Sequence, residues 1–322
     1  MDFIQRNLRS FAEGPGARIV LAAFFVILCW AYSPIGIHIG LEAYQPGHLA
    51  LIRFLIASAF MAGVAAVMGV SPPRLKDLPL LAGLGFFAVS LHHIALNFGQ
   101  RGVSAGAASV LAQSTPLFST LLAHFVLKER VSHWQWICVL GGLFGAAVVV
   151  TGDRGFGELD AHGLLILLAA LSWSVYFAMQ KRHSHRYDEL TMVCYTIWSG
   201  TTLLLVYAPG LWSEVQKAPA SVNLAVLILG IFPSALAYLA WAYVLAHSYV
   251  SRVSMSLYLI PPTALLMASV ALAERPSIMV VIGMVIVLSS VLALSLKPSK
   301  PRESAAHRDF REKAPGAVDQ SP

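Results

Sequence analysis

Ten apolar segments, each about 20 residues long, constrain most strongly what this chain can fold into. A helix of about 20 residues spans the roughly 30 Å hydrocarbon core of a bilayer. The segments are apolar on every face, so they lack the strict alternation that transmembrane strands require. The sequence therefore predicts an all-α polytopic membrane protein with ten transmembrane helices. The predicted spans cover approximately residues 19–39, 48–70, 78–98, 103–127, 134–151, 163–180, 190–211, 222–246, 250–273 and 278–296.

The composition supports a membrane protein. Hydrophobic residues make up 57% of the 322 residues and charged residues 12%, which leaves more apolar surface than one soluble core could bury. The net charge of +6 could suit a nucleic-acid binder, but the basic residues lie at segment ends and in the tails. We expect a small-molecule substrate and the lipid bilayer as partners, and no nucleic acid. A monomer is compatible with this interpretation. The three cysteines lack the spacing of metal ligands, so neither a metal nor a cofactor is expected.

The basic residues also predict an orientation. Of the 22 Lys and Arg residues, seventeen fall on the side of the predicted topology that holds both termini. Four fall on the opposite side, and Arg53 lies within the second span. Because Lys and Arg concentrate on the cytoplasmic side of membrane proteins, both termini are expected in the cytoplasm of a multi-pass cell (inner) membrane protein. The tails, residues 1–18 and 297–322, are then cytoplasmic, and the second is expected to be disordered.

An internal repeat is the clearest sign of architecture. The fourth and ninth spans match at an offset of 145 residues. The matched pairs are Ser109 with Ser254, Pro116 with Pro261, Leu127 with Leu272, Glu129 with Glu274, Arg130 with Arg275, and Ser132 with Ser277. With five spans in each half, an odd number, the second half must be inverted in the membrane. Residues 19–155 and 156–296 are the two predicted repeats, an arrangement typical of secondary transporters.

The residues of this repeat resemble a known family. The first copy runs from Ala107-Ala108-Ser109 through Pro116-Leu117-Phe118 to Leu127-Lys128-Glu129-Arg130, and the second from Pro261-Pro262 to Leu272-Ala273-Glu274-Arg275. Both are similar to the EamA-type transporters of the drug/metabolite transporter superfamily. The resemblance implies two EamA-type repeats of five helices each. It also implies a permease or exporter of small metabolites, often amino acids, and in one branch aromatic amino acids.

Polar and aromatic side chains at helical spacing define a candidate cavity. Its predicted lining residues are Trp30, Ser33, His93, Asn97, Gln113, Trp173, Tyr176, Gln180, Tyr238, Trp241, Ser254 and Tyr258. Ser90, His93 and Asn97 share one helix face, and His92 is expected to point elsewhere. For the aromatic residues, a place in the belt at the membrane interface, or packing, is the alternative to lining a cavity. For His93, an interhelical hydrogen bond and proton carriage are the alternatives.

Other residues also allow two interpretations. Pro116 and Pro261 are expected to kink their helices, either toward the cavity or for packing alone. The pairs Glu129-Arg130 and Glu274-Arg275 either bond donors at helix ends or form gating contacts between the halves. Arg53 either snorkels outward or bonds backbone carbonyls, or it attracts a substrate carboxylate.

The motifs that are missing narrow the function. The spans hold no HExxH sequence, acid pair or nucleophile motif, so an intramembrane enzyme is not expected. They also lack the charged rings or filter loops of a channel. No Asp or Glu lies mid-span, which removes the usual proton carrier. The sequence predicts a small-metabolite transporter, with facilitated diffusion favoured over proton-coupled multidrug or metabolite export. In this hypothesis the solute binds between the first, third, sixth, eighth and ninth spans, and the halves alternate in access.

Overall fold

The structure is a computed structural model that describes residues 15–125, 131–152, 161–183, 186–247, 257 and 259–296. Every regular element within these residues is a helix. Four residues with predicted roles, Glu129, Arg130, Ser254 and Tyr258, lie outside the described part of the chain. Most of the two predicted tails lies outside it as well.

The first half of the chain begins with two long helices and continues with shorter pieces. Its elements are α2 (Pro15–Gly40), α3 (Pro46–Met68), the 3-10 turn η1 (Leu75–Asp77), α4 (Leu78–Gly85), the π-helical segment η2 (Phe86–Leu91), α5 (His92–Gly99), α6 (Ala105–Ala112), α7 (Thr115–Phe125) and α8 (His133–Gly152).

The second half follows a similar order. Its elements are α9 (Ala161–His183), α10 (Glu189–Leu204), the 3-10 turn η3 (Leu205–Tyr207), α11 (Leu211–Lys217), α12 (Ala220–Ile231), the π-helical segment η4 (Phe232–Leu236), α13 (Ala237–His247), α15 (Ile260–Ala271) and α16 (Ile278–Leu296).

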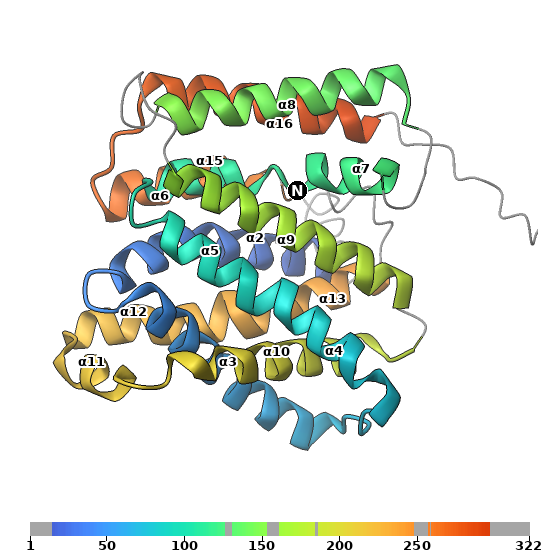
Figure 1. Cartoon of the computed structure of the whole chain (residues 1–322), viewed down its shortest axis with the longest axis vertical. Helices are drawn as coiled ribbons and strands as arrows, with labels where there is room; N and C mark the ends of the chain where they lie inside the picture. The colour runs from blue at the N-terminus through green and yellow to red at the C-terminus, as the bar shows by residue number, and fades with distance from the viewer. Residues whose placement is uncertain are drawn as a thin grey trace, which may run out of the picture.

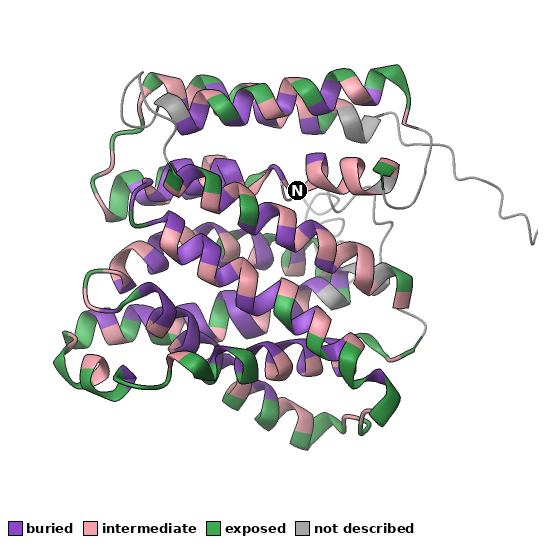
Figure 2. Ribbon diagram, viewed as in Figure 1, coloured by how far each residue is buried: buried purple, intermediate pink, exposed green. Residues whose placement is uncertain are grey.

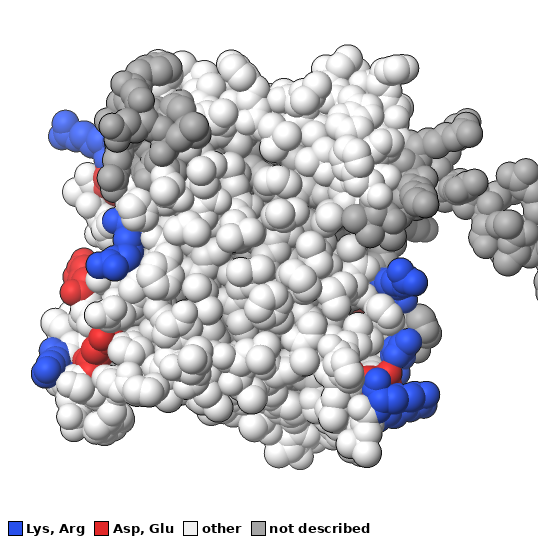
Figure 3. Space-filling model, in the orientation of Figure 1, with Lys and Arg blue, Asp and Glu red and all other residues white. Residues whose placement is uncertain are grey.

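Within the described residues, seven helical segments are long and apolar enough to cross a membrane. They are Arg18–Gly40, Pro46–Met68, Leu75–Gly99, His133–Val150, Ala161–Gln180, Glu189–Tyr207 and Ala220–Trp241. Lysine, arginine and acidic side chains gather at two opposite edges of the molecule in the view of Figure 3, and an uncharged band lies between them. This distribution fits a bilayer around the band, because charged side chains are costly in hydrocarbon. The described part of the chain is therefore all-helical and fits a membrane protein with several spans, and the predicted total of ten spans stays a prediction.

Helices from the two halves of the chain pack against one another in layers (Figure 1). Helix α9 lies against α5, α10 against α3 and α4, and α12 and α13 against α2. Helices α8 and α16 form a pair along one edge of the molecule (Figure 1). Buried residues concentrate in the layers between, as Figure 2 shows. The centre of the molecule is thus built from both halves.

The fourth predicted span is two short helices and not one kinked helix. Helix α6 ends at Ala112, and α7 begins at Thr115, directly before Pro116. Proline lacks the N–H that would bond the carbonyl four residues earlier, here that of Ala112. The hydroxyl of Thr115 donates to this carbonyl instead, at 2.9 Å. The sequence pattern of a single helix would place Ser109, Gln113 and Pro116 on one face, but the break between α6 and α7 removes that continuous face.

Pro261 also lies at the start of a helix. It is the second residue of α15, after the N-cap residue Leu259, where a missing N–H has no cost because the first-turn donors have no partner within a helix. The mid-span kinks predicted at both prolines are thus replaced by helix starts in the described residues.

Two π-helical segments occupy corresponding positions in the two halves. Segment η2 joins α4 to α5, and η4 joins α12 to α13, so each lies within the third long helix of its half. Pro233 in η4 frees the carbonyl of Leu229, and the hydroxyl of Ser234 donates to that carbonyl at 2.8 Å. A π-helical turn adds one residue to the helix and often marks a functional site.

The seventh predicted span extends too far. Its helix α10 ends at Leu204, and the chain turns through Gly210, whose φ of +87° suits glycine. The short helix α11 that follows carries Glu214 back over the end of the bundle.

Candidate functional site

Five of the predicted aromatic residues form one cluster in the centre of the molecule. The aromatic cluster consists of Trp30 on α2, Trp173 and Tyr176 on α9, and Tyr238 and Trp241 on α13. The Trp30 ring lies 6.3 Å from Tyr238 and 5.7 Å from Trp241, centroid to centroid. Trp173 lies 5.7 Å from Tyr238 and 5.1 Å from Tyr176. Three elements distant in sequence therefore present aromatic rings to one another.

Most of these contacts are tilted or edge-to-face, as the ring quadrupole favours. Trp30 and Trp173 remain half-buried, whereas Tyr176, Tyr238 and Trp241 are buried. Trp30 is also tied to the second half of the chain, because its indole N–H donates to the Pro233 carbonyl at 3.2 Å. Pro233 is part of η4, so the cluster adjoins a π-helical segment.

Arg53 on α3 lies beside this cluster and is only 2% exposed. Its Nε donates to Ser234 Oγ at 2.5 Å, Nη1 to His93 Nδ1 at 3.2 Å, and Nη2 to Ser33 Oγ at 3.2 Å. The expectation that Arg53 snorkels outward or bonds backbone carbonyls is therefore wrong. Three side chains from α2, α5 and η4 hold the guanidinium inside the protein, because together they offer it polar atoms at a depth where lipid offers none.

His92 and His93 have different surroundings. His93 contacts Arg53, as described, and its ring lies 4.6 Å from the Phe54 ring. His92 points toward α9, where its Nδ1 lies 2.8 Å from the Ala169 carbonyl and its ring 4.8 Å from Trp173. The expected separation of the two histidines is thus present, yet His92 also touches the aromatic cluster. His92 was not among the predicted cavity residues.

The other predicted cavity residues are not all in this place. Asn97 is fully buried and donates to the Pro46 carbonyl at 3.0 Å, at the first turn of α3. Gln113 is the C-cap residue of α6. Gln180 lies near the end of α9, about two turns beyond Trp173. Ser33 contacts Arg53, and the remaining two residues, Ser254 and Tyr258, lie outside the described part of the chain.

Glu274 makes a contact between the two halves. Its carboxylate accepts the backbone N–H of Ala105 at 2.9 Å and that of Gly106 at 3.2 Å, in the first turn of α6. A carboxylate is stabilised at a helix N-terminus by the unpaired N–H groups and the helix dipole. The helix-end hydrogen bond predicted for Glu274 is thus also a contact between the two halves, and a gating role for it stays a prediction. The side chain of the neighbouring Arg275 is exposed.

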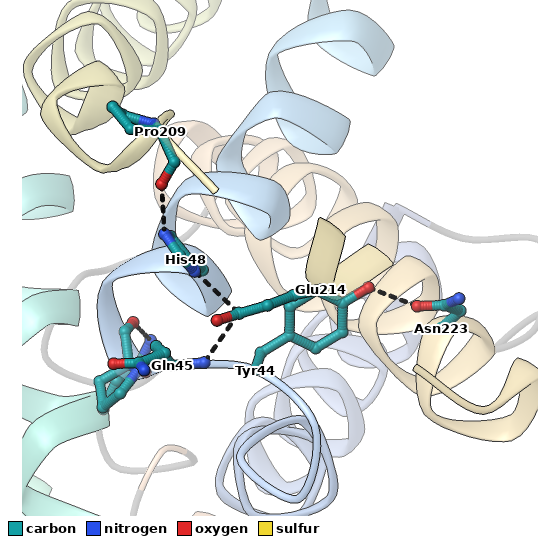
Figure 4. A network of polar contacts seen from close by, with 8 residues as sticks. Tyr44, Gln45, His48, Pro209, Glu214 and Asn223 are labelled. Atoms are coloured by element: carbon teal, nitrogen blue, oxygen red, sulfur yellow. Dashed lines mark hydrogen bonds and ion pairs between the residues drawn. The ribbon is translucent and has the colours of Figure 1, made fainter. Parts of the chain in front are cut away.

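A second polar contact between halves lies at the N-terminal end of α3 (Figure 4). The Glu214 network consists of Tyr44, Gln45, His48, Glu214 and Asn223. Glu214 Oε2 accepts the backbone N–H of Gln45 at 3.0 Å and lies 2.8 Å from His48 Nδ1. The Tyr44 hydroxyl donates to the side-chain oxygen of Asn223. Burial raises the pKa of Tyr44, as does the charge of Glu214, so the hydroxyl stays protonated and able to donate.

A third contact lies beyond the other end of α3. The Asp77 cluster consists of Asp77, Arg186 and Tyr187. Asp77 forms an ion pair with Arg186 and accepts the Tyr187 hydroxyl at 2.9 Å. The same hydroxyl accepts the backbone N–H of Arg74 at 3.0 Å. Polar contacts thus join the halves at both ends of the bundle.

Several of these residues were missed by sequence reasoning. Ser234 could have been found from its position after Pro233 in an otherwise apolar span, because a freed carbonyl needs a new donor. Glu214 and Asp77 look like ordinary loop residues, and only the packing of the two halves shows their partners.

Comparison with known proteins identifies the family. The model of the EamA-like transporter family matches the chain twice, at residues 17–151 and 162–296. The chain belongs to this family. The resemblance of the repeated segments to EamA-type drug/metabolite transporters is thereby confirmed, and the two matches account for nearly all of the described residues.

Curated relatives of this EamA-type protein carry transporter names. An uncharacterized transporter, YdfC, of Bacillus subtilis is 36% identical over 88% of this chain and 92% of its own length. A probable terminal-alkyne amino-acid exporter of Streptantibioticus cattleyicolor is 32% identical, covering 90% and 97% of the two chains. A probable amino-acid metabolite efflux pump of Salmonella typhimurium is 26% identical over 84% of this chain and 92% of its own length.

A solved structure shares the fold. This crystal structure, of a protein given no functional name, is 22% identical and superposes with a TM-score of 0.60 over 87% of this chain and 97% of its own. The family matches and the transporter relatives together make the chain a membrane transporter of the EamA type.

Proposed function

We propose that this transporter exports small metabolites, foremost amino acids including aromatic ones, by alternating access. The observation that carries the proposal is the aromatic cluster, in which Trp30 of the first family repeat contacts Tyr238 and Trp241 of the second, and Tyr238 in turn contacts Trp173. Secondary transporters bind their solutes between repeats near the bilayer midplane. The names of two relatives, a probable terminal-alkyne amino-acid exporter and a probable amino-acid metabolite efflux pump, support this substrate class.

The proposed architecture has ten spans in two inverted halves, residues 19–155 and 156–296. Together α6 and α7 cover residues 105–125, which at 1.5 Å per residue is about 30 Å, enough for one broken span. Unequal numbers of Lys and Arg at the two ends support cytoplasmic termini in the inner cell membrane. The matching positions of η2 and η4 support the internal repeat.

The Glu214 network and the Asp77 cluster suggest how access alternates. Each joins the two halves at one end of α3. In the proposed cycle the halves rock so that one of these contacts opens while the other stays closed. The solute then reaches the aromatic cluster from one side at a time.

Facilitated diffusion is the favoured mode, since no carboxylate of the sequence lies mid-span to carry a proton. Proton-coupled export is the second candidate, and the adjacent rings of His92 and His93, 4.6 Å apart, favour it.

The test is counterflow in liposomes that contain the purified full-length protein. Labelled phenylalanine, leucine, threonine and lysine would be offered to vesicles preloaded with the unlabelled compound, with and without a pH gradient, and protein-free liposomes are the control. Saturable uptake of one chemical class is the expected result. A response to the pH gradient would establish proton coupling, and uptake of no amino acid would remove this substrate class.

A further inference from the structure

The guanidinium of Arg53 is a charge inside the membrane region without a counter-charge among the groups that bond it. Arg53 is the eighth residue of α3, about 10 Å along the helix axis from its start. Its side chain is 2% exposed. The three groups that bond it, on Ser33, His93 and Ser234, are neutral acceptors.

The acidic side chains that join the two halves are engaged elsewhere. Asp77 pairs with Arg186, Glu214 lies against His48, and Glu274 caps α6. Among the described residues, none forms an ion pair with Arg53. A buried cation without an anion is costly in a membrane protein and ordinarily marks a substrate or ion pathway.

The donors around this charge outnumber the acceptors. A guanidinium has five N–H donors, and the bonds to Ser33, His93 and Ser234 use three of them. Because arginine only donates, His93 accepts through Nδ1, so its Nε2 carries the proton in the neutral ring. This Nε2 is buried and has no hydrogen-bond partner among the residues that the structure describes. Within the described part of the chain, two guanidinium N–H groups and one imidazole N–H are therefore without an acceptor.

The ligand that complements such a set has acceptors only and a negative charge. A carboxylate meets both needs, with two oxygens that match the planar fork of arginine. The aromatic cluster adjoins this position, because the ring of His93 packs edge-to-face against that of His92, and the His92 ring lies 4.8 Å from the ring of Trp173. A solute with a carboxylate at one end and an apolar or aromatic group at the other fits both surfaces.

We propose that Arg53, with the Nε2–H of His93, is the receptor for the carboxylate of the transported solute. The inference rests on the proposed function and deepens it: the substrates are small carboxylates such as free α-amino acids, and not their amides, decarboxylated amines or cationic drugs. Ser33 and Ser234 position the guanidinium from the first and second halves of the chain.

The test compares an acid with its amide in the full-length protein. Counterflow of phenylalanine and of phenylalaninamide would be measured in wild type, Arg53→Gln and the control Arg101→Gln, which removes an exposed arginine from the loop after α5. Wild type and the control are expected to favour the acid by at least about tenfold, the size of a charge-assisted hydrogen bond. Arg53→Gln is expected to abolish this preference, whereas a merely structural arginine would slow both compounds alike.

Each other outcome is decisive. Equal transport of acid and amide by wild type, or a preference retained in Arg53→Gln, overturns the carboxylate receptor and leaves the carrier intact. Inhibition by inorganic phosphate but not by 3-phenylpropionate overturns it in favour of a different anion. Transport of no amino acid and no amide overturns the proposed function and this inference together. Gel filtration and thermal unfolding test whether Arg53→Gln folds. If it does not fold, Arg53→Lys takes its place, because lysine keeps the positive charge but lacks the planar guanidinium with its paired N–H donors. Arg53→Lys must then show a reduced preference for the acid over the amide.

Discussion

The carboxylate of Glu274, three residues after the end of α15, accepts the backbone N–H of Ala105 at 2.9 Å and so caps α6 from the other half of the chain. The second half of the transporter thereby completes a helix terminus of the first. A side chain that caps a helix is worth about 0.5 to 2 kcal/mol, so this contact contributes to the stability of the conformation seen here.

Replacing Glu274 with Ala is expected to lower the free energy of unfolding by about 1 kcal/mol. Replacement with Gln keeps one acceptor oxygen but loses the charge that favours a helix N-terminus, so its effect is expected to be about half as large. Thermal unfolding in detergent measures both. Glu42→Gln is the control, since Glu42 is exposed in the turn after α2, and a Glu274→Ala protein as stable as this control would contradict the capping role.

Weakening the Glu214 network is expected to open the end of the bundle at which α3 begins. The double variant Tyr44→Phe with Glu214→Gln loses the hydroxyl bond to Asn223 and the contact of the Glu214 carboxylate with His48. If the closed state of this end loses about 1 to 2 kcal/mol of stabilisation, the equilibrium between its closed and open states shifts roughly five- to thirtyfold toward the open state. A cysteine at position 173, in a background free of the native cysteines, should then react faster with a membrane-impermeant maleimide added on the side of the membrane where α3 begins.

Asp77→Asn serves as the opposite control for this measurement. It weakens the contact with Arg186 beyond the other end of α3, so the same cysteine should become more reactive from the other side of the membrane. Increased labelling from both faces in either variant would indicate general loosening and contradict alternating access.

Trp173→Ala is expected to reduce kcat/KM for phenylalanine by at least about tenfold, or 1.4 kcal/mol. The ring contacts His92, Tyr176 and Tyr238, so its loss removes a surface for the solute as well as packing. Trp173→Phe should retain most of the activity. Trp212→Phe, on the exposed helix α11, is the control, and equal kinetics of Trp173→Ala and this control would place the solute elsewhere.

The grouping of Trp30, Trp173, Tyr238 and Trp241 could be predicted in outline from the sequence. Helical periodicity fixes which residues of one helix share a face, and large aromatic residues deep in a span face protein as readily as lipid. The repeat then indicated which helices meet, and the family matches support that duplication. The contacts of Arg53 could not be predicted in the same way. Ser33 and Ser234 are ordinary serines within apolar spans, and only the packing of three helices turns them toward one guanidinium.

The breaks in the helices were harder still to predict. A proline indicates that a backbone bond is lost, but not whether the helix kinks or ends. At Pro116 the outcome depends on Thr115, whose side chain takes over the freed carbonyl, and on Ser174 of α9, which donates to the Thr115 carbonyl at 2.8 Å. The second of these contacts belongs to the tertiary structure and has no local signature.

The roles of Thr115 and Pro116 can be separated by a double-mutant cycle. In the native sequence, Thr115→Val leaves the Ala112 carbonyl without a partner, and an unsatisfied acceptor costs about 1 to 3 kcal/mol. In a Pro116→Ala background, the restored N–H of residue 116 can bond this carbonyl as in a continuous helix. Thr115→Val should therefore cost less in that background, by about 1 kcal/mol in thermal unfolding. Additive effects of the two substitutions would mean that the hydroxyl of Thr115 does not replace the bond that proline removes.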